Sequence, residues 1–315
     1  MTGMKLLGDE ELPVREATCI AIGNFDGCHI GHTRLFETAK LTAEKNGWKT
    51  LAWSFREHPE NILSGGVKVK GINSLEEKAE LISRLGVELA YFADFEKVRD
   101  MTPEGFVGDV LCGSFGAAHV VCGFNFTFGK NGAGNVETLS ELLGKRGVGV
   151  TVIPPVTSDG VPVSSSLIRR AVEDGDMEKA AEMLGRHFFI SFPVVRGKRL
   201  GRTIGAPTVN QNFPPDRLVP GRGVYAVKAE FDGKTYCGVS NVGVRPTVSD
   251  GGGVNCETHI LDFSGELLGK NIRVIFLKKL RDEKKFPSLE LLAEQIARDV
   301  KEARTYFGKE EKIYP

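Results

Sequence analysis

The sequence predicts two domains of different class, an α/β domain built on a parallel sheet and then a mainly β domain that ends in a helix. Up to about residue 185, short apolar runs alternate with longer segments of helical period. From about His187 onward, β-branched and aromatic runs are separated by turns that contain glycine. The length of 315 residues is sufficient for two hydrophobic cores. We therefore expect domains at residues 1–186 and 187–315.

The first domain contains five apolar runs with the length and composition of buried strands. They are Thr18–Ile22, Lys49–Phe55, Leu89–Phe92, His119–Cys122 and Gly149–Ile153. Between them, Ser74 and Glu77 form a capping box at a helix start, and Gly86 stands where a left-handed residue would end that helix. Thr102 followed by Pro103 is typical of another helix start. This alternation favours parallel strands joined by crossover helices.

The second domain follows a helical pair and ends in a closing helix. The pair breaks at residues 174–176 and ends at Gly185. Asp232-Gly233 and Ser264-Gly265 each stand between two strand-like runs, and they predict two β-hairpins. After Pro287, apolar residues recur on one stripe of a helix that we expect to pack on the sheet or barrel. The stripe comprises Leu289, Leu292, Ala293, Ile296, Val300 and Phe307.

The composition excludes several classes of partner. The chain has 41 Lys and Arg against 41 Asp and Glu, so it lacks the basic excess that nonspecific binding to nucleic acid or acidic membranes requires. It has no run of about 18 apolar residues, and its N-terminus turns acidic before a signal-peptide core can form. The six cysteines form no C-x-x-C pair, which argues against a zinc site or a disulfide framework. We expect a cytoplasmic protein with small-molecule ligands.

The segment after the first strand has the layout of a phosphate-binding site. Glycines allow the backbone to approach an anion, a helix N-terminus offers N–H groups, and two imidazoles three residues apart lie on one helix face. The residues concerned are Gly23, Gly27, Gly31, His29 and His32. The alternative is a strand, turn and helix with incidental histidines. A metal site is less favoured, because H-x-x-H brings neither a third ligand nor a glutamate. We interpret Asp26 as a helix cap or a fastener of the loop.

The string His29-Ile30-Gly31-His32 is the nucleotide-binding signature of class I aminoacyl-tRNA synthetases and small nucleotidyltransferases, which transfer an adenylyl group from ATP. From about residue 15 to residue 305, the chain more specifically resembles the prokaryotic family of bifunctional riboflavin kinases and FAD synthetases. GNFDGCHIGH matches that family's G-x-F-D-G-x-H-x-G-H. SFREHP, GFNFTFGK and VSSSLIRR are similar to its next blocks, although Glu57 and Phe124 depart from the residues common there.

For the first domain, the resemblance implies a Rossmann-like nucleotidyltransferase fold. The phosphate of FMN would attack the α-phosphorus of ATP, and pyrophosphate would leave. His29, His32 and Arg169 would act in catalysis together with Mg²⁺. The residues that would face the β- and γ-phosphates with Arg169 are Ser164, Ser165 and Ser166. The alternative for this group is a helix cap and a solvated helix face.

The resemblance also implies where ATP and flavin would bind in the first domain. Asn125 is assigned to hydrogen bonding with either of them. Three rings, Phe55, Phe126 and Phe128, form an apolar wall for the flavin or pack in the core. The other binding positions are Gly23, Phe25, Asp26, Gly27 and Gly31.

The segment GKRLGRTIGAPTVN contains a second candidate site. Pro207 favours an extended backbone, in which Thr208 and Asn210 lie on one face and offer two neutral oxygens to Mg²⁺. A turn followed by an edge strand explains the spacing equally well. The segment also resembles the riboflavin kinase signature G-x-x-x-G-x-P-T-x-N, which runs here from Gly201 through Gly205 to Asn210.

For the second domain, the resemblance implies an antiparallel β-barrel that phosphorylates riboflavin with ATP. The family's catalytic glutamate corresponds to Glu257 in CETHILDF, and it would accept the proton of the ribityl 5′-hydroxyl. Arg281 would close over the flavin with Asp282 and Phe286, and a solvated run of charges is the alternative. The implied binding positions are Gly201, Gly205, Pro207 and Arg281.

Together these features predict a cytoplasmic enzyme that makes FMN from riboflavin and then FAD from FMN, with ATP as co-substrate and Mg²⁺ at both sites. We expect no nucleic-acid or membrane partner, and the sequence leaves a homo-oligomer open. One alternative is a tRNA-synthetase fragment or another adenylyltransferase with the same histidine signature. The other is a flavin- or nucleotide-binding regulator in which a site has decayed.

Overall fold

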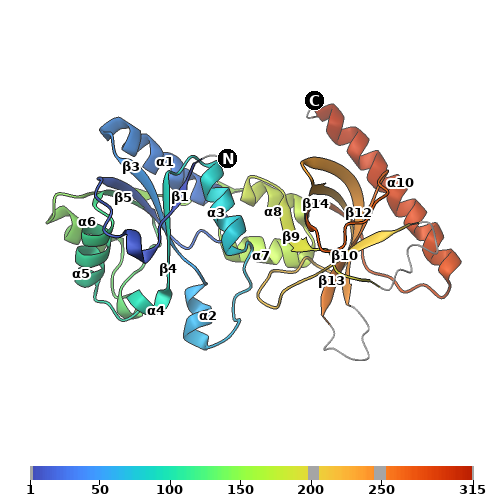
Figure 1. Cartoon of the computed structure of the whole chain (residues 1–315), viewed down its shortest axis with the longest axis horizontal. Coiled ribbons are helices and arrows are strands. Elements are labelled where there is room, and N and C mark those ends of the chain that lie inside the picture. The colour runs from blue at the N-terminus through green and yellow to red at the C-terminus, as the bar shows by residue number, and fades with distance from the viewer. Residues whose placement is uncertain (1–2, 198–205, 245–252, 314–315) are drawn as a thin grey trace. The chain divides into compact units, whose positions relative to one another are not determined.

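The computed structural model describes residues 3–197, 206–244 and 253–313, with side chains described up to residue 308. It divides into two units, the first ending at Ser165 and the second beginning at Ser166 (Figure 1). The division falls at the start of helix α7 (Ser165–Asp174), so most of α7 and all of α8 (Met177–Leu184) belong to the second unit. The expected boundary between functional domains near residue 186 stays a prediction.

The first unit is built on a six-stranded parallel sheet with the strand order β1-β4-β3-β2-β5-β6. Its strands are β1 (Lys5–Leu6), β2 (Thr18–Ile22), β3 (Lys49–Phe55), β4 (Leu89–Ala93), β5 (Ala117–Gly123) and β6 (Gly149–Ile153). The five predicted strands are confirmed, and β2, β3 and β6 have the predicted bounds. The sequence pattern does not predict β1 or the small hairpin of β7 (Thr157–Ser158) and β8 (Val161–Pro162), because strands of two residues carry no period.

The helices of this unit are α1 (Ile30–Asn46), α2 (Pro59–Ser64), α3 (Leu75–Arg84), α4 (Phe95–Val98), α5 (Pro103–Gly105) and α6 (Val136–Gly144). The capping box is confirmed: the Glu77 N–H donates to Ser74 Oγ at 3.1 Å, and the Ser74 N–H donates to the Glu77 carboxylate at 2.8 Å. Gly86 has the left-handed φ of +81° expected after that helix. Thr102 caps α5, but the segment that follows, Phe106–Ser114, is a π-helix.

The core of the first unit supports the carboxyl edge of its sheet. All five residues of β2 are buried, and Trp53 on β3 packs edge-on against Phe106 with ring centroids 5.3 Å apart. Burying a large apolar side chain of this kind contributes roughly 1.5–3 kcal/mol. The loops that follow β2 and β3 therefore stand on a rigid base, at the edge where open parallel sheets place their ligand sites.

The second unit contains a six-stranded sheet with the order β10-β13-β12-β11-β14-β9, in which every neighbouring pair is antiparallel. The strands are β9 (Phe188–Pro193), β10 (Thr208–Asn212), β11 (Gly223–Phe231), β12 (Lys234–Val244), β13 (Val254–Ile260) and β14 (Asn271–Arg281). The Val195 N–H donates to the Asn210 carbonyl at 2.8 Å, and the buried Gln211 amide donates to the carbonyls of Phe192 at 2.7 Å and Ile272 at 2.8 Å. The bond from Gln211 to Phe192 joins the two outer strands, β10 and β9, and the bond from Val195 continues this contact just past β9, so the sheet curves toward the expected barrel.

One of the two predicted hairpins is confirmed and the other is wrong. Asp232 and Gly233, with φ of +49° and +71°, form the turn between β11 and β12. Ser264-Gly265 does not join a hairpin, because β13 pairs with β10 and β12 whereas β14 pairs with β11 and β9. Both edges of each strand are occupied by other strands, and a local turn signal carries no information about this order.

Helix α10 (Leu289–Ile313) closes the second unit. Ala303 and Phe307 are buried against Val224 and Val239 of the sheet, which confirms the expected packing of the helix. The predicted stripe is wrong at its start, since Leu289 is 47% exposed. The buried residues Ala303 and Phe307 lie in the later turns of the helix, and its first turn remains exposed to solvent at Leu289 and Leu291.

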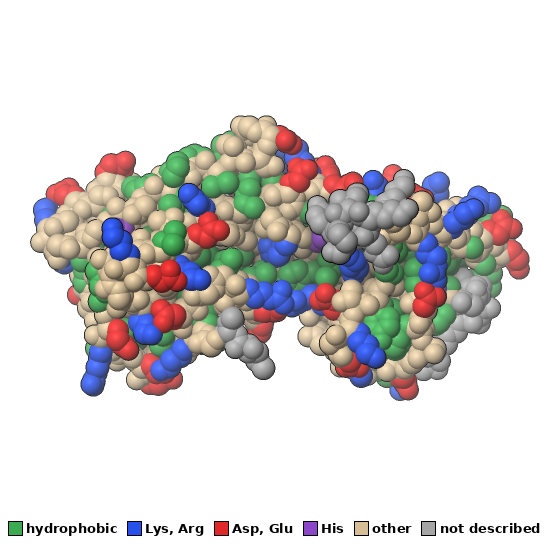
Figure 2. Space-filling model, turned by 90° about the horizontal axis from the view of Figure 1, so that it is seen from above, with side chains coloured by type: hydrophobic (Ala, Val, Ile, Leu, Met, Phe, Trp, Pro, Cys, Tyr) green, Lys and Arg blue, Asp and Glu red, His purple; other side chains and the backbone are tan. Residues whose placement is uncertain are grey.

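The surface carries charges of both signs. Figure 2 shows acidic and basic side chains interspersed on the face that it draws, in keeping with equal totals of 41 each in the sequence. Within the residues that the structure describes, no helix combines the length and the apolar character needed to cross a membrane. All six cysteines are free thiols, as expected from their spacing.

Candidate active sites

The loop between β2 and α1 places two imidazoles side by side. Phe25, Gly27 and Cys28 have positive φ angles of +50°, +83° and +39°, and these turn the chain sharply before the helix. His29 is the N-cap of α1, and its Nδ1 accepts the His32 N–H at 3.3 Å. The two rings stack with centroids 3.6 Å apart and an interplanar angle of 18°. The structure thus brings both predicted histidines together at a helix N-terminus.

Two of the glycines make this close packing possible. A Cβ at Gly31 would lie 3.0 Å from the His29 ring, and a Cβ at Gly23 would lie 3.0 Å from the Phe25 ring. The Phe25 ring itself is fully buried and meets the His32 ring edge-on at 5.3 Å. Its side chain therefore supports the loop from inside, and contact of Phe25 with a ligand stays a prediction.

Asp26 fastens the loop to the chain that precedes α3. Its buried carboxylate accepts the Ile72 N–H at 3.0 Å and the Asn73 N–H at 3.4 Å. The Asp26 carbonyl accepts the Ser165 hydroxyl at 2.9 Å, so one of the three predicted serines contacts the histidine loop. Ser164 and Ser166 flank it, and Arg169 follows one turn later on α7, in the second unit. Of the two roles predicted for Asp26, that of a loop fastener is confirmed and that of the cap of α1 is wrong, because His29 caps α1.

Lys78 is a residue of this site that the sequence analysis missed. Its ammonium donates to the carbonyls of Asn24 and Phe55, each at 3.1 Å, and so joins the loop after β2 to the carboxyl end of β3. Burial lowers the pKa of Lys78, and the negative charge of Asp26 opposes this shift. The available signal was its position, because Lys78 falls on the buried stripe of α3 with Leu81 and Ile82.

The predicted aromatic wall packs on the core of the first unit. Phe128 is buried, and Phe126 stacks on it with centroids 5.7 Å apart. Phe55 is partly buried between Trp53 and Phe95. Asn125 lies exposed in the turn that follows β5. Core packing thus accounts for all three phenylalanines, and their contact with a flavin stays a prediction.

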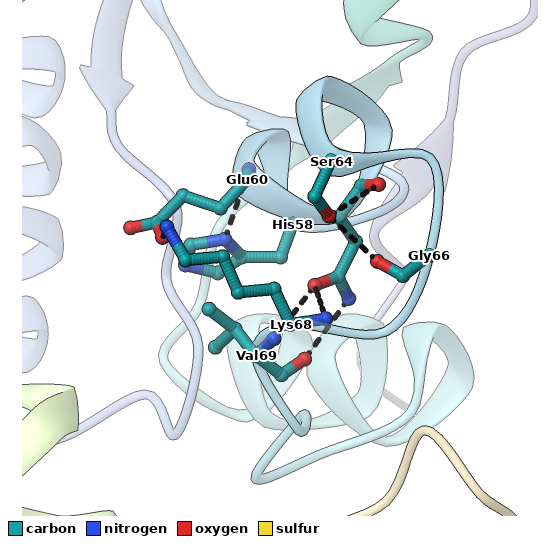
Figure 3. A network of polar contacts seen from close by, with 7 residues as sticks. His58, Glu60, Ser64, Gly66, Lys68 and Val69 are labelled. Carbon is teal, nitrogen blue, oxygen red and sulfur yellow. Dashed lines mark hydrogen bonds and ion pairs between the residues drawn. The ribbon is translucent and has the colours of Figure 1, made fainter.

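A polar network shapes residues 58–69, which begin within the SFREHP block just after β3 (Figure 3). His58 caps α2 by accepting the Glu60 N–H at 3.3 Å. Asn61 accepts the N–H groups of Lys68 at 2.9 Å and Val69 at 2.7 Å, and it donates to the Val69 carbonyl at 2.9 Å. An ion pair of 2.9 Å joins Lys68 to Glu60. These bonds hold Lys68 and Val69 against α2.

The second site lies across neighbouring strands of the barrel. Strand register places Glu257 of β13 directly opposite Asn210 of β10 on one side and Asn241 of β12 on the other. Directly opposite residues share a face of the sheet, so these three side chains form a row. Thr208, two residues before Asn210, belongs to the same face. The structure thus brings together the residues predicted to bind metal and the predicted base.

Asn255 connects members of this row. Its Nδ2 donates to Asn210 Oδ1 at 3.2 Å and to Glu257 Oε1 at 3.1 Å. Gly197 lies against the Asn210 amide so closely that a Cβ there would collide with it. The sequence analysis missed Asn255, although its place two residues before Glu257 puts it on the same face of β13.

A cavity of about 390 Å³ opens beside the row. It is lined by Gly197, by residues 207–210 and by residues 263–268, together with neighbouring strand residues. Pro207 lies at this cavity, whereas Gly201 and Gly205 fall outside the described residues. Among the residues that the structure describes, no group of three or more His, Cys, Asp or Glu side chains could hold a metal. The neutral oxygens of Thr208 and Asn210 fit Mg²⁺, which takes much of its shell from water and phosphate.

Arg281 has a structural partner. Its guanidinium binds the buried Asp299 carboxylate of α10, with Nε to Oδ1 at 2.9 Å and Nη2 to Oδ2 at 2.7 Å. It also lies 5.7 Å from the centre of the Phe286 ring. Asp282 is exposed and pairs with Lys279 at 2.7 Å. The ion pair anchors the last helix to the end of β14, and contact of Arg281 with a flavin stays a prediction.

Comparison with known proteins assigns both halves of the chain. A family model described as FAD synthetase matches residues 12–167, and one described as riboflavin kinase matches residues 184–307. A relative from Bacillus subtilis (strain 168), named bifunctional riboflavin kinase/FMN adenylyltransferase, is 38% identical over 92% of each chain. The chain belongs to the bifunctional riboflavin kinase/FMN adenylyltransferase family. The resemblance inferred from the sequence motifs is confirmed.

Other relatives extend the similarity across the whole chain. A protein of the same name from Escherichia coli (strain K12) is 34% identical over 93% of this chain and 94% of its own. A solved structure described as a macrolide-efflux protein from Streptococcus pneumoniae has a TM-score of 0.84 and 28% identity, and it covers 96% of this chain and 99% of its own. The fold of each unit is therefore similar to that of the corresponding part of the solved structure.

Proposed function

We propose that the protein phosphorylates riboflavin to FMN in its second unit and adenylylates FMN to FAD in its first, with ATP as co-substrate of both reactions. The observation that carries the proposal is the row in which Glu257 stands opposite Asn210, in a chain that also stacks His29 on His32 at a helix N-terminus. A phosphotransferase site and an adenylyltransferase site are thus built from different elements. The family membership of the chain supports both activities.

In adenylyl transfer, the N-terminus of α1 and the two histidines bind the phosphates of ATP. Because His29 Nδ1 accepts the His32 N–H, that nitrogen carries no proton, and Nε2 is the donor that His29 offers to a phosphate. An oxygen of the FMN phosphate attacks the α-phosphorus, and the bond to the bridging oxygen of pyrophosphate breaks. Charge on the leaving group is spread over the helix N–H groups, His29 and His32. The assignment of Arg169 and the neighbouring serines to the β- and γ-phosphates is part of this proposal.

In the kinase reaction, Glu257 accepts the proton of the ribityl 5′-hydroxyl as its oxygen attacks the γ-phosphorus, and ADP leaves. Thr208 and Asn210 would hold Mg²⁺, which supplies positive charge to the phosphates when bound. The cavity beside Thr208 and Asn210 would take the nucleotide. We further propose that residues 1–186 and 187–315 are the two functional domains. We also propose a cytoplasmic location, where both ATP and free flavins are available as substrates.

The proposal is tested by incubating the pure protein with riboflavin and Mg-ATP and separating the flavins by chromatography. We expect FMN and FAD to accumulate, and the absence of both would overturn the proposal. Glu257→Ala should lose FMN formation by a factor of about 10²–10⁴ but still make FAD from supplied FMN. His29→Ala should show the converse. Loss of both activities in either variant, when it is well folded, would contradict two separate sites.

A further inference from the structure

We propose that Asn255 is a positioning residue of the kinase site: its side-chain amide orients the Glu257 carboxylate and ties it to Asn210. This inference rests on the proposed function, because it concerns the residue that accepts the riboflavin hydroxyl proton. No family motif identified in the sequence includes Asn255, and the bonds it makes are what single it out.

The hydrogen bonds of Asn255 account for both of its donors. One N–H is directed to Asn210 Oδ1 at 3.2 Å and the other to Glu257 Oε1 at 3.1 Å. A primary amide has two N–H groups, so neither is left for another partner. The bond to Oε1 restricts rotation of the Glu257 carboxylate. One side chain therefore fixes both the rotation of the base and its register with the metal-binding residue.

The position of Asn255 in the sheet argues against a role in ordinary packing. It is only 4% exposed, and asparagine is disfavoured in strands. Burying an amide is costly unless its hydrogen bonds are made inside the protein. Its neighbours in register are Asn212 on β10 and Gly243 on β12, and the glycine contributes no side chain to cover it. An apolar residue would fill this place without that cost, so the amide is explained by the two polar groups that it holds.

The expected effect concerns turnover rather than substrate binding. If Asn255 only orients Glu257, replacing Asn255 leaves the riboflavin pocket intact. It lowers the fraction of enzyme–substrate complexes in which the Glu257 carboxylate is correctly oriented toward the riboflavin hydroxyl. We expect Asn255→Leu, which has a similar volume and no donor, to lower kcat of FMN formation by about 10- to 100-fold, the rate equivalent of one hydrogen bond to a charged group. KM for riboflavin and the binding of riboflavin, measured by quenching of its fluorescence without ATP, should stay unchanged.

The chain provides matched controls. Asn212→Leu makes the same substitution at the exposed residue directly opposite Asn255, and it should leave kcat unchanged. FAD formation from supplied FMN, catalysed by the first unit of the same variant protein, should also be unchanged. If Asn255→Leu does not fold, as judged by thermal melting, Asn255→Val suits a strand and also lacks the amide donor, and the same loss of kcat is expected.

A double variant separates positioning from a general effect on structure. If Asn255 acts through Glu257, then Asn255→Leu combined with Glu257→Gln is no slower than Glu257→Gln alone. Losses that multiply in the double variant, a kcat of Asn255→Leu equal to that of the parent protein, or an equal loss in Asn212→Leu would each overturn the proposal. An inactive parent protein would instead overturn the proposed function, so the two failures are distinguishable.

Discussion

Replacement of Asp26 by alanine should selectively destabilise the first unit and stop FAD formation. The substitution leaves the buried N–H groups of Ile72 and Asn73 without their carboxylate acceptor, which they reach at 3.0 and 3.4 Å. A hydrogen bond to a charged group contributes about 1.5–3 kcal/mol, and the longer bond counts for less, so we expect a loss of roughly 3 kcal/mol. For a unit of this size, that loss lowers Tm by roughly 6–12 °C. Asp26→Asn keeps an acceptor for Ile72 and should cost only about 1 kcal/mol.

Tryptophan fluorescence during urea unfolding measures this loss in the first unit alone. The chain has two tryptophans, Trp48 and Trp53, and both lie in the first unit. Glu37→Ala is the control, because its exposed pair with Arg34 on α1 should leave the urea midpoint unchanged. FMN formation should persist in Asp26→Ala while FAD formation falls. An unchanged urea midpoint in Asp26→Ala, or equal losses in the alanine and asparagine variants, would refute the role of this carboxylate as a fastener.

Three further predictions follow from buried groups. Burial lowers the pKa of Lys78 below its ordinary 10.5, so as pH rises toward 10.5 the folded protein releases this proton before the unfolded chain does, and the first unit gains stability. Lys78→Met should abolish this rise in the urea midpoint, and an unchanged slope in the variant would contradict the prediction. Arg281→Met leaves the Asp299 carboxylate buried without its partner and should lower the free energy of unfolding of the second unit by about 3–5 kcal/mol. The double variant Arg281→Met with Asp299→Leu should regain both the stability and the kinase activity. A stable but inactive double variant would show instead that Arg281 contacts the flavin. Burial raises the pKa of Cys19 to about 12 and those of Cys122 and Cys256 to about 11. Iodoacetamide at about pH 8 should therefore label these three thiols only when the protein is unfolded in urea. Mass spectrometry of the peptides measures the labelling, and labelling of these thiols in the folded protein would contradict the prediction.

Local signals in the sequence predict the local structure well. The runs that become β2, β3 and β6 are apolar throughout, and the capping pair of Ser74 and Glu77 marks the start of α3. The histidine loop is predictable because a strand, three glycines and a helix start stand in a fixed order. These features depend on interactions between residues close together in the chain. Such interactions form independently of contacts between distant segments.

Features that depend on distant segments could not be predicted in the same way. Ser264-Gly265 has the composition of a hairpin turn, but the partners of β13 and β14 are chosen by the whole sheet. Lys78 binds one carbonyl in the loop after β2 and another at the end of β3, and Asn255 binds Asn210 on another strand. For Lys78 and for Asn255, the sequence shows only a single polar residue among apolar ones. The partner that makes its burial favourable is visible only in the fold.

The strand order of the second unit also determines when that unit can form during synthesis. Ile190 of β9 pairs with Val274 of β14, so the first strand of the barrel meets its partner only after almost the whole chain has left the ribosome. Every strand of the parallel sheet of the first unit, in contrast, is complete by Ile153. Pairings between residues so far apart in sequence form slowly, and a growing chain keeps the edge of β9 exposed until they form. The half of the protein that carries Glu257 is therefore the half that a stalled or truncated chain cannot build.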